Sequence, residues 1–225
     1  MNSYLVLGAG RFGRLALQRL RAREPDCEIC LVDHDPQKFS LIDTSQTVRT
    51  VTAAAADFLA DTLAAGTRPD WIVPAVPRHV AWEWLQRQQP PGEVWRQLPV
   101  PPAVGLNLPL VMRGGGGEVY LSLSTRRCPD DCPEPAEKCF LTNNPRDFNL
   151  YDYLANLALQ DYSSLVIRSQ QLAPGVGGYR PAALWQLHRQ VLASKGKVLV
   201  STACRCHGVC QALEKMIETE ALVDI

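Results

Sequence analysis

In the first part of the chain, short apolar runs alternate with segments whose apolar residues recur at helical spacing. The runs that predict strands are residues 4–7, 28–33, 48–53 and 70–77. The segments that predict helices are residues 13–23, 55–66 and 79–88. Strands separated by helices pair in parallel through right-handed crossovers. The pattern therefore predicts a parallel sheet covered by helices.

Residues 88–109 interrupt this alternation because they are rich in proline, which breaks regular elements. We therefore expect a domain boundary near residues 90–105, which divides the chain into residues 1–100 and 101–225. The second part again has α/β character. Its predicted strands are residues 118–125, 163–169 and 197–202, and its predicted helices are residues 148–159, 181–196 and 208–222. One helix joins the last two strands, so they are expected to be parallel neighbours.

The first predicted strand leads into the glycine-rich motif "GAGRFG". In a G-x-G-x-x-G motif, Gly8 permits a tight turn and Gly10 lets a pyrophosphate approach the backbone. Gly13 lets the following helix pack closely on the strand. Arg11 and Phe12 lie inside the motif, where the N–H groups of the helix N-terminus face the phosphates. These five residues are candidate cofactor-binding residues.

The second predicted strand ends in Asp33, twenty residues after Gly13. A carboxylate at this position accepts hydrogen bonds from an adenosine ribose and repels a 2′-phosphate. The motif and this residue together predict a Rossmann domain that binds NAD(H). The expected fold class is therefore α/β, with a parallel-sheet Rossmann domain followed by a smaller α/β cysteine-rich domain.

The stretches "YLVLGAGRFGRLALQRL" and "LVDHDPQKF" resemble the TrkA-N type of NAD-binding domain, which recurs in the saccharopine dehydrogenase-like group. The resemblance covers the first 80 residues. It implies a Rossmann fold that binds NAD(H) or another adenine nucleotide through Gly8, Gly10, Gly13 and Asp33. The family usually carries a Gly-Asp pair after the third strand, where this chain reads "TAAAADF". Only nucleotide binding is therefore carried over from the family.

The second part of the chain contains two short clusters of cysteines, spaced C-x3-C-x6-C and C-x-C-x3-C. We expect the two clusters to converge on one metal site. The candidate metal ligands are Cys128, Cys132, Cys139, Cys204, Cys206 and Cys210. The second cluster lies at a predicted strand end that leads into a helix, and thiolates near a helix N-terminus have lowered pKa values, which favours metal ligation.

Three interpretations of these cysteines remain open. All-cysteine ligation and two Cys-Pro pairs fit an iron–sulfur cluster, although neither spacing matches a ferredoxin signature. Structural zinc usually takes two C-x2–4-C pairs, and Cys128 with Cys132 and Cys206 with Cys210 approach that spacing; His207 is an alternative ligand. The third interpretation is thiol redox chemistry without a metal.

Composition limits the classes of function. Acidic and basic residues balance at 23 each, so the overall charge does not indicate nucleic acid or an anionic membrane as a partner. No apolar run reaches the ~18 residues of a membrane span, and the N-terminus does not resemble a signal peptide. We therefore expect a cytoplasmic protein. Eight cysteines in a reducing compartment favour metal binding or thiol chemistry over disulfides.

Two functional hypotheses follow. In the first, the protein is an oxidoreductase or electron-transfer component that passes electrons between NAD(H), a metal centre and a redox partner protein. Because hydride carries two electrons and iron–sulfur clusters take one at a time, the dinucleotide on the glycine motif could instead be a flavin. In the second, it is a non-catalytic module that senses NAD(H) or redox state around a structural zinc. His79, after the fourth predicted strand, is either an acid–base residue near a nicotinamide or a cap of the following helix.

Overall fold

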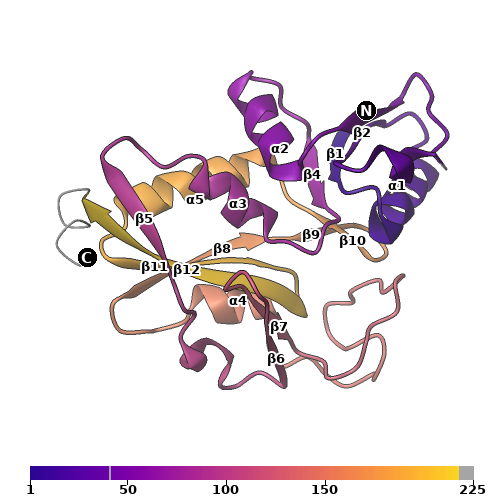
Figure 1. Ribbon diagram of the computed structural model, residues 1–225. Helices are drawn as coiled ribbons and strands as arrows, with labels where there is room; N and C mark the ends of the chain where they lie inside the picture. Colours follow the sequence, from indigo (N-terminus) through magenta and orange to yellow (C-terminus); the bar gives the residue numbers. More distant parts are fainter. Residues whose placement is uncertain (41, 218–225) are drawn as a thin grey trace.

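The computed structural model describes residues 1–40 and 42–217, which form two main β-sheets with helices packed on and between them (Figure 1). The first sheet, sheet A, contains four parallel strands in the order β3-β2-β1-β4 within the described residues. Its strands are β1 (Ser3–Leu7), β2 (Glu28–Asp33), β3 (Val48–Thr52) and β4 (Trp71–Pro74). The associated helices are α1 (Arg11–Arg23), α2 (Ala55–Ala64) and α3 (Val80–Gln86), and a 3-10 turn, η1 (Pro36–Phe39), follows β2. The strands and helices predicted for the first part are thus confirmed.

Strand β1 is apolar on both faces because sheet A is covered on both sides. Tyr4 and Val6 pack in the core cluster that also contains Leu17 and Leu20 of α1. Their neighbours on β1 point to the other face, into the cluster that contains α3. This alternation follows from the two-residue period of a strand. It explains why the first predicted strand appears in the sequence as a continuous apolar run.

The second sheet, sheet B, has the order β6-β7-β12-β11-β8, with β5 paired to the distal part of β12. Its strands are β5 (Glu93–Leu98), β6 (Leu110–Arg113), β7 (Val119–Ser122), β8 (Tyr162–Arg168), β11 (Lys197–Ala203) and β12 (His207–Ile217). The remaining elements are η2 (Pro102–Gly105), α4 (Leu150–Ala155), α5 (Pro181–Ala193) and the hairpin formed by β9 (Gln170–Ala173) and β10 (Val176–Gly178). As predicted, β8 and β11 are parallel neighbours, whereas the other described pairs of sheet B are antiparallel.

The helix predicted for residues 208–222 is wrong in its described part, which is strand β12. Alanine, leucine, glutamate and lysine in this segment favour a helix locally. The segment instead pairs with β11 along one edge and with β7 and β5 along the other. Tertiary pairing on both edges therefore overrides local propensity. Residues 218–222 of the predicted helix lie outside the described residues.

Strand β5 was not predicted, because it lies inside the proline-rich segment 88–109. It pairs antiparallel with β12, so a strand that falls within the expected first domain belongs to sheet B. Proline flanks this strand at positions 90, 91 and 99 but is absent from its interior. Prolines at the ends of a strand leave its ladder hydrogen bonds intact.

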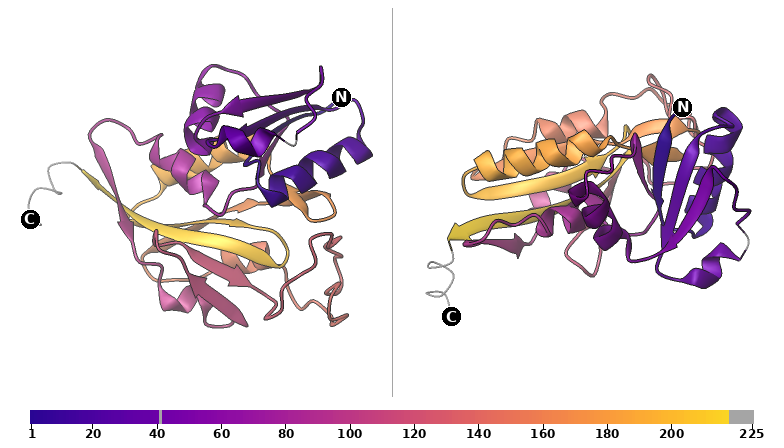
Figure 2. Two further views of the ribbon diagram at one scale, coloured as in Figure 1. Left: turned by 45° about the vertical axis from the view of Figure 1, so that its right-hand side comes forward. Right: turned by 90° about the horizontal axis from the view of Figure 1, so that it is seen from above.

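The two sheets share one hydrophobic core. Leu7 and Ile72 of sheet A, Val200 and Leu213 of sheet B, and Trp84 of α3 belong to the same cluster of buried residues. Figure 2 shows α3 and α5 lying between the N-terminal sheet and the long strand β12. This common core fixes the carboxyl edge of sheet A relative to sheet B. Among the described helices, none has the length and apolar character needed to cross a bilayer.

Candidate functional site

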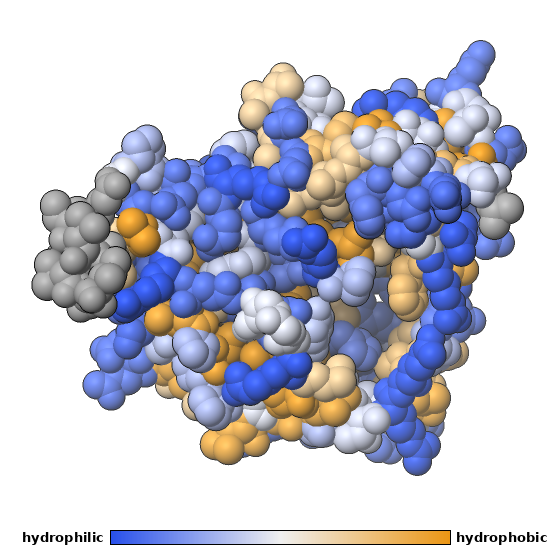
Figure 3. All heavy atoms as spheres, in the orientation of Figure 1, coloured by the Kyte–Doolittle hydropathy of each residue, from blue (hydrophilic) through white to orange (hydrophobic). Residues whose placement is uncertain are grey.

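A cavity of about 640 Å³ separates the start of α1 from sheet B and from the loop between β7 and α4. The space-filling view shows the surface hollowed between the N-terminal part and this loop (Figure 3). Phe12 of the glycine motif lines the cavity, as do Leu110, Met112 and Tyr120 of the β6–β7 hairpin. The predicted nucleotide turn therefore faces the second half of the chain.

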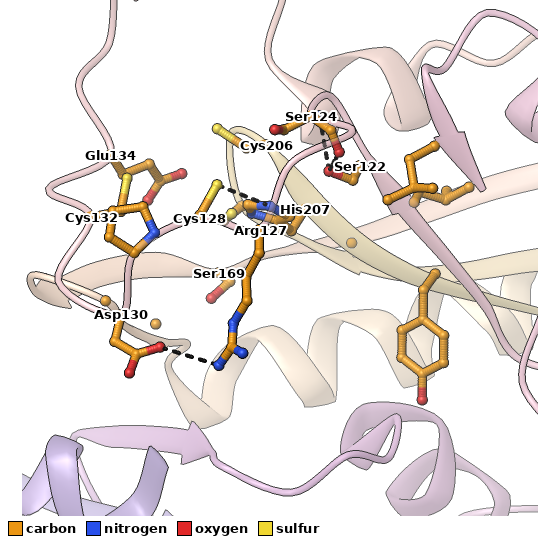
Figure 4. Close-up of a pocket in the computed structure, with 18 of the residues that line it drawn as sticks. Ser122, Ser124, Arg127, Cys128, Asp130, Cys132, Glu134, Ser169, Cys206 and His207 are labelled. Atoms are coloured by element: carbon orange, nitrogen blue, oxygen red, sulfur yellow. Dashed lines mark hydrogen bonds and ion pairs between the residues drawn. The ribbon is translucent and has the colours of Figure 1, made fainter. Parts of the chain in front are cut away.

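Cysteines from both clusters meet at this cavity, as expected from the sequence. Cys128 and Cys132 reach it from the β7–α4 loop, and Cys204 and Cys206 reach it from the turn between β11 and β12. The Cys128 Sγ atom lies 3.6 Å from the Nε2 atom of His207, although the two residues are 79 positions apart. Figure 4 shows the sulfur atoms of Cys128, Cys132 and Cys206 on the same side of the cavity, with His207 beside Cys128. Folding thus brings the two clusters together.

Cys139 faces an adjoining cavity of about 390 Å³. Cys128 and Cys206 line both cavities and therefore stand between Cys139 on one side and Cys132 and Cys204 on the other. Five of the six predicted ligands thus line two neighbouring cavities, and Cys128 and Cys206 line both of them.

The chain around Cys139 forms a turn whose donors point at the sulfur. The hydroxyl of Thr142 and the backbone N–H groups of Thr142 and Leu141 donate hydrogen bonds to the Cys139 thiolate and lower its pKa. Asn143 adopts a left-handed conformation, with φ of 59°, and its N–H returns to the carbonyl of Cys139. Such N–H···S bonds favour the thiolate form, which is the form that ligates metals.

The turn at Cys204 repeats this arrangement. The N–H groups of Cys206 and His207, two and three residues further on, donate to the Cys204 sulfur. Burial nevertheless dominates and raises the pKa of Cys204 to about 12. Burial also raises the pKa values of Cys128 and Cys206. These thiols are therefore neutral unless a bound cation supplies positive charge.

Cys210 does not join the other five. It is fully buried within strand β12, where it pairs with Val119 and Ser201, and it packs in the core beneath α4. The expectation that the second cluster leads into a helix is wrong, because the described part of this segment is strand β12. Cys210 behaves as a small apolar core residue.

The described residues contain no group of three or more His, Cys, Asp or Glu side chains already arranged to hold a metal ion. The thiols therefore border a common space without closing around a single point. A single zinc ion needs four donors at about 2.3 Å from one centre for sulfur. That arrangement is not preformed among the described side chains.

The loop that carries the first cysteine cluster is attached to α1. Asp130 forms an ion pair with Arg11, and its backbone carbonyl accepts a hydrogen bond of 2.6 Å from Arg19 Nη1. The carbonyl of Cys132 accepts a hydrogen bond of 2.6 Å from Gln171 of β9. Sequence reasoning missed these residues, because no local pattern indicates which arginine meets which carbonyl across the fold.

The glycine turn has the close packing that the motif predicts. Gly8 has φ of +110°, and a Cβ at Gly13 would stand 1.8 Å from the Gly8 carbonyl oxygen. At Gly10, in contrast, no described residue beyond its own chain neighbours has an atom within 4 Å of the position of a Cβ. Packing therefore explains Gly8 and Gly13, whereas the space at Gly10 is open to a ligand.

Asp33 is nearly buried, with 4% of its surface exposed. Its carboxylate accepts hydrogen bonds from the N–H groups of Ala9 and Asp35, at 2.8 and 3.0 Å, and from Lys38 Nζ. These donors outweigh the effect of burial and lower its pKa. Asp33 thus holds the backbone of the glycine turn in addition to any contact with a ligand.

His79 lies in the interior rather than at an open rim. Its Nδ1 atom is 3.1 Å from Gln211 Oε1, and its Nε2 atom is 3.1 Å from Thr202 Oγ1. Burial lowers its pKa to about 4, so the ring is neutral near pH 7. The residue joins the start of α3 to β11 and β12, which is a structural role.

Comparison with known proteins corrects the family resemblance inferred from the N-terminal motif. The family model that matches is AF_1314_C, described as "Uncharacterized protein, C-terminal domain", over residues 81–216. No TrkA-N or Rossmann family model matches. The glycine motif misled the assignment because it specifies a local turn that unrelated families share.

A curated relative from Archaeoglobus fulgidus, itself described as "Uncharacterized protein", is 30% identical over 227 residues. The similarity covers 94% of this chain and 99% of the relative. No solved structure matches the chain at a significant level. Because the family model matches more than half of the chain, including all six candidate metal ligands, the chain belongs to the AF_1314_C family.

Proposed function

We propose that this protein is an NAD(H)-binding redox protein whose cysteines hold a metal centre, preferably an iron–sulfur cluster, beside the bound dinucleotide. One observation carries the proposal: a single cavity is bounded by cysteines of both clusters and by Phe12 of the glycine motif. Two sites expected from distant parts of the sequence would open into the same space. Proximity of a hydride carrier and a metal centre is what electron transfer between them requires.

The carboxyl edge of sheet A would act as a Rossmann-type nucleotide site. The space at Gly10 is open, and α1 begins with no side-chain cap and no acidic residue in its first turn. The N–H groups of that turn and the positive end of the helix dipole would bind a pyrophosphate. We expect Asp33 to support this site chiefly by holding the amide of Ala9.

The position of the cavity supports a dinucleotide over a mononucleotide. Val176 and Gly177 of β10 line the cavity, and β10 leads to a bridge between Tyr179 and Ile72 of β4. The cavity therefore lies on the β4 side of the glycine turn. A dinucleotide with its adenosine over β2 extends past β1 toward this side. Its second half would thus reach the cysteines.

Cys128, Cys132, Cys139 and Cys206 are the proposed ligands. Burial raises the pKa of Cys128, and negative charge on Cys132, Cys206 or Cys139 would raise it further. A metal centre would offset the repulsion between these sulfurs when they are ionised. Cys204, whose pKa burial raises to about 12, is the reserve ligand.

The donor set favours an iron–sulfur cluster over zinc. The proposed ligands are all thiolates, which suit both metals. A cluster spreads its thiolates over several irons and so needs them farther apart than one zinc ion does. The described thiols border a space without surrounding one point, which fits the larger group. When bound, a cluster supplies one-electron transfer, so FAD on the same glycine turn is an alternative cofactor to NAD(H).

Anaerobic purification with a visible spectrum and counts of iron, sulfide and zinc tests the metal proposal. We expect a brown protein that contains iron, and loss of the iron in Cys128→Ser. Cys210→Ala is the matched control and should keep the metal, because its sulfur lies in the core. Titration with NADH by calorimetry tests the nucleotide site. A colourless protein that carries neither metal, or one that fails to bind NADH and FAD, would refute the corresponding half.

A second candidate function is a non-catalytic sensor with structural zinc. The ion pair between Arg11 and Asp130 favours it, because this pair links the nucleotide turn to the cysteine loop and so could report occupancy. Turnover of NADH with an artificial electron acceptor would support the redox protein. Binding of NADH without turnover, together with stoichiometric zinc, would support the sensor.

A further inference from the structure

Arg146 connects the two segments that carry the cysteine clusters. Its Nη1 atom donates to Cys206 Sγ at 2.6 Å. Its Nη2 atom donates to the carbonyl of Pro135 at 3.1 Å and to that of Lys138 at 3.4 Å. A single guanidinium thus binds the second cluster with one nitrogen and the loop of the first cluster with the other.

The charge of Arg146 acts on sulfur in both clusters. It is among the groups that lower the pKa values of Cys206, Cys128 and Cys139, although burial outweighs it at Cys206 and Cys128. The side chain lines the cavity that contains these three thiols. A fixed cation at this place compensates negative charge whichever thiol carries it.

The Nε atom of Arg146 is buried and lacks a hydrogen-bond partner among the described residues. A buried N–H of a charged group that stays unpaired destabilises the folded state. Orphan donors of this kind are rare in folded proteins and call for a partner. The guanidinium would satisfy this donor if a further anionic acceptor occupied the space beside the thiols.

We infer that Arg146 has two roles at the metal centre. Its positive charge and its N–H groups stabilise the ligating sulfur, and its hydrogen bonds brace the two cysteine segments, holding them at the distance that the centre needs. The inference rests on the proposed function for the metal itself. Hydrogen bonds to cluster sulfur raise a reduction potential, because they stabilise the more negative reduced state. Arg146 would therefore both retain the metal and raise its potential.

Three variants separate charge from bracing. Arg146→Gln removes the charge and the fork of donors, whereas Arg146→Lys keeps the charge but cannot reach sulfur and two carbonyls at once. Arg126→Gln is the control, because Arg126 is an exposed cation that lines both cavities and donates no hydrogen bond to sulfur among the described residues. Circular dichroism and thermal melts establish that each variant is folded.

In metal-loaded protein, we expect Arg146→Gln to lose metal to a chelator roughly tenfold faster or more. Its reduction potential should shift to a more negative value. Arg146→Lys should show the faster loss with a smaller shift of potential, and the Arg126 control should match the wild type. A folded Arg146→Gln protein with unchanged chelator resistance and unchanged potential would overturn the inference.

In metal-free protein, the rate of cleavage by trypsin tests independently whether Arg146 holds the loop of the first cluster. Lys138 is exposed and lies in the loop that Arg146 holds, so trypsin should cleave after Lys138 faster in Arg146→Gln than in wild type. If the wild type binds no metal but this acceleration occurs, the proposed function fails and the bracing role stands. If the wild type binds metal and neither metal retention nor cleavage depends on Arg146, the inference alone fails.

Discussion

Asp130, two residues after Cys128, forms an ion pair with Arg11, the first residue of the helix that follows the glycine turn. Arg127 also lies 4.0 Å from the Asp130 carboxylate. The pair joins the proposed phosphate site to the cysteine loop. A phosphate bound at the start of α1 would offer Arg11 a second anionic partner and would compete with Asp130.

Asp130→Asn should therefore strengthen nucleotide binding. The variant removes a competing anion from Arg11, whose side chain is 61% exposed, so the gain should be modest, about two- to fivefold. The gain should shrink as salt concentration rises, because exposed charges are screened. Calorimetric titration with NADH measures it. Asp131→Asn, an exposed neighbour, is the control, and equal affinities in the two variants would show that the ion pair does not compete.

Gly10 and Gly13 should respond differently to alanine. Gly13→Ala places a methyl group 1.8 Å from the Gly8 carbonyl oxygen and should lower the free energy of unfolding by at least about 3 kcal/mol. Gly10 has φ of −68° and open space, so Gly10→Ala should fold normally. It should weaken nucleotide binding roughly tenfold, since the methyl group would block the pyrophosphate. Unaltered affinity in folded Gly10→Ala would exclude this turn as the phosphate site.

His79 should make stability depend on pH in the acidic range. Burial lowers its pKa to about 4, whereas the unfolded chain has the ordinary value of 6.5. Between these values the unfolded state binds more protons than the folded state. The contribution is fully present above pH 6.5 and is lost as pH falls toward 4, with a limit of about 3 kcal/mol.

His79→Asn should flatten this dependence. Urea unfolding at pH 5 and pH 7.5 measures the difference in free energy of unfolding for wild type and variant. His207, whose pKa burial also lowers, should account for part of the slope that remains in His79→Asn. An identical pH dependence in wild type and His79→Asn would contradict the assignment.

Asn143 should matter for metal retention through its backbone conformation. A β-branched residue is strained at φ of 59°, so Asn143→Val should distort the turn that directs the amides of Leu141 and Thr142 at Cys139. We expect faster loss of metal to a chelator in this variant. Asn143→Gly accepts the same conformation and should retain metal like the wild type. If both variants retain metal equally well, Cys139 does not ligate it.

Much of the first half follows from the sequence by itself. The four parallel strands and three helices were predicted because apolar periodicity is set by each element's own geometry. The turn at Gly8 and Gly13 was predicted for the same reason, since its constraint is local. The expectation that the two cysteine clusters approach each other also held, because the end of β7, which leads to the first cluster, pairs with the start of β12, which adjoins the second cluster.

Only the tertiary structure decided the rest. The segment at 208–217 has helical composition yet is strand β12, because it finds pairing partners on both edges. Because this segment is a strand, Cys210 lies in the core and the other five candidate ligands line the cavities. The positions of Arg146, Asp130 and His79 likewise depend on contacts between segments far apart in the chain. A sequence pattern indicates the conformation that each segment favours by itself. These contacts between distant segments depend instead on the free energy of packing the whole chain.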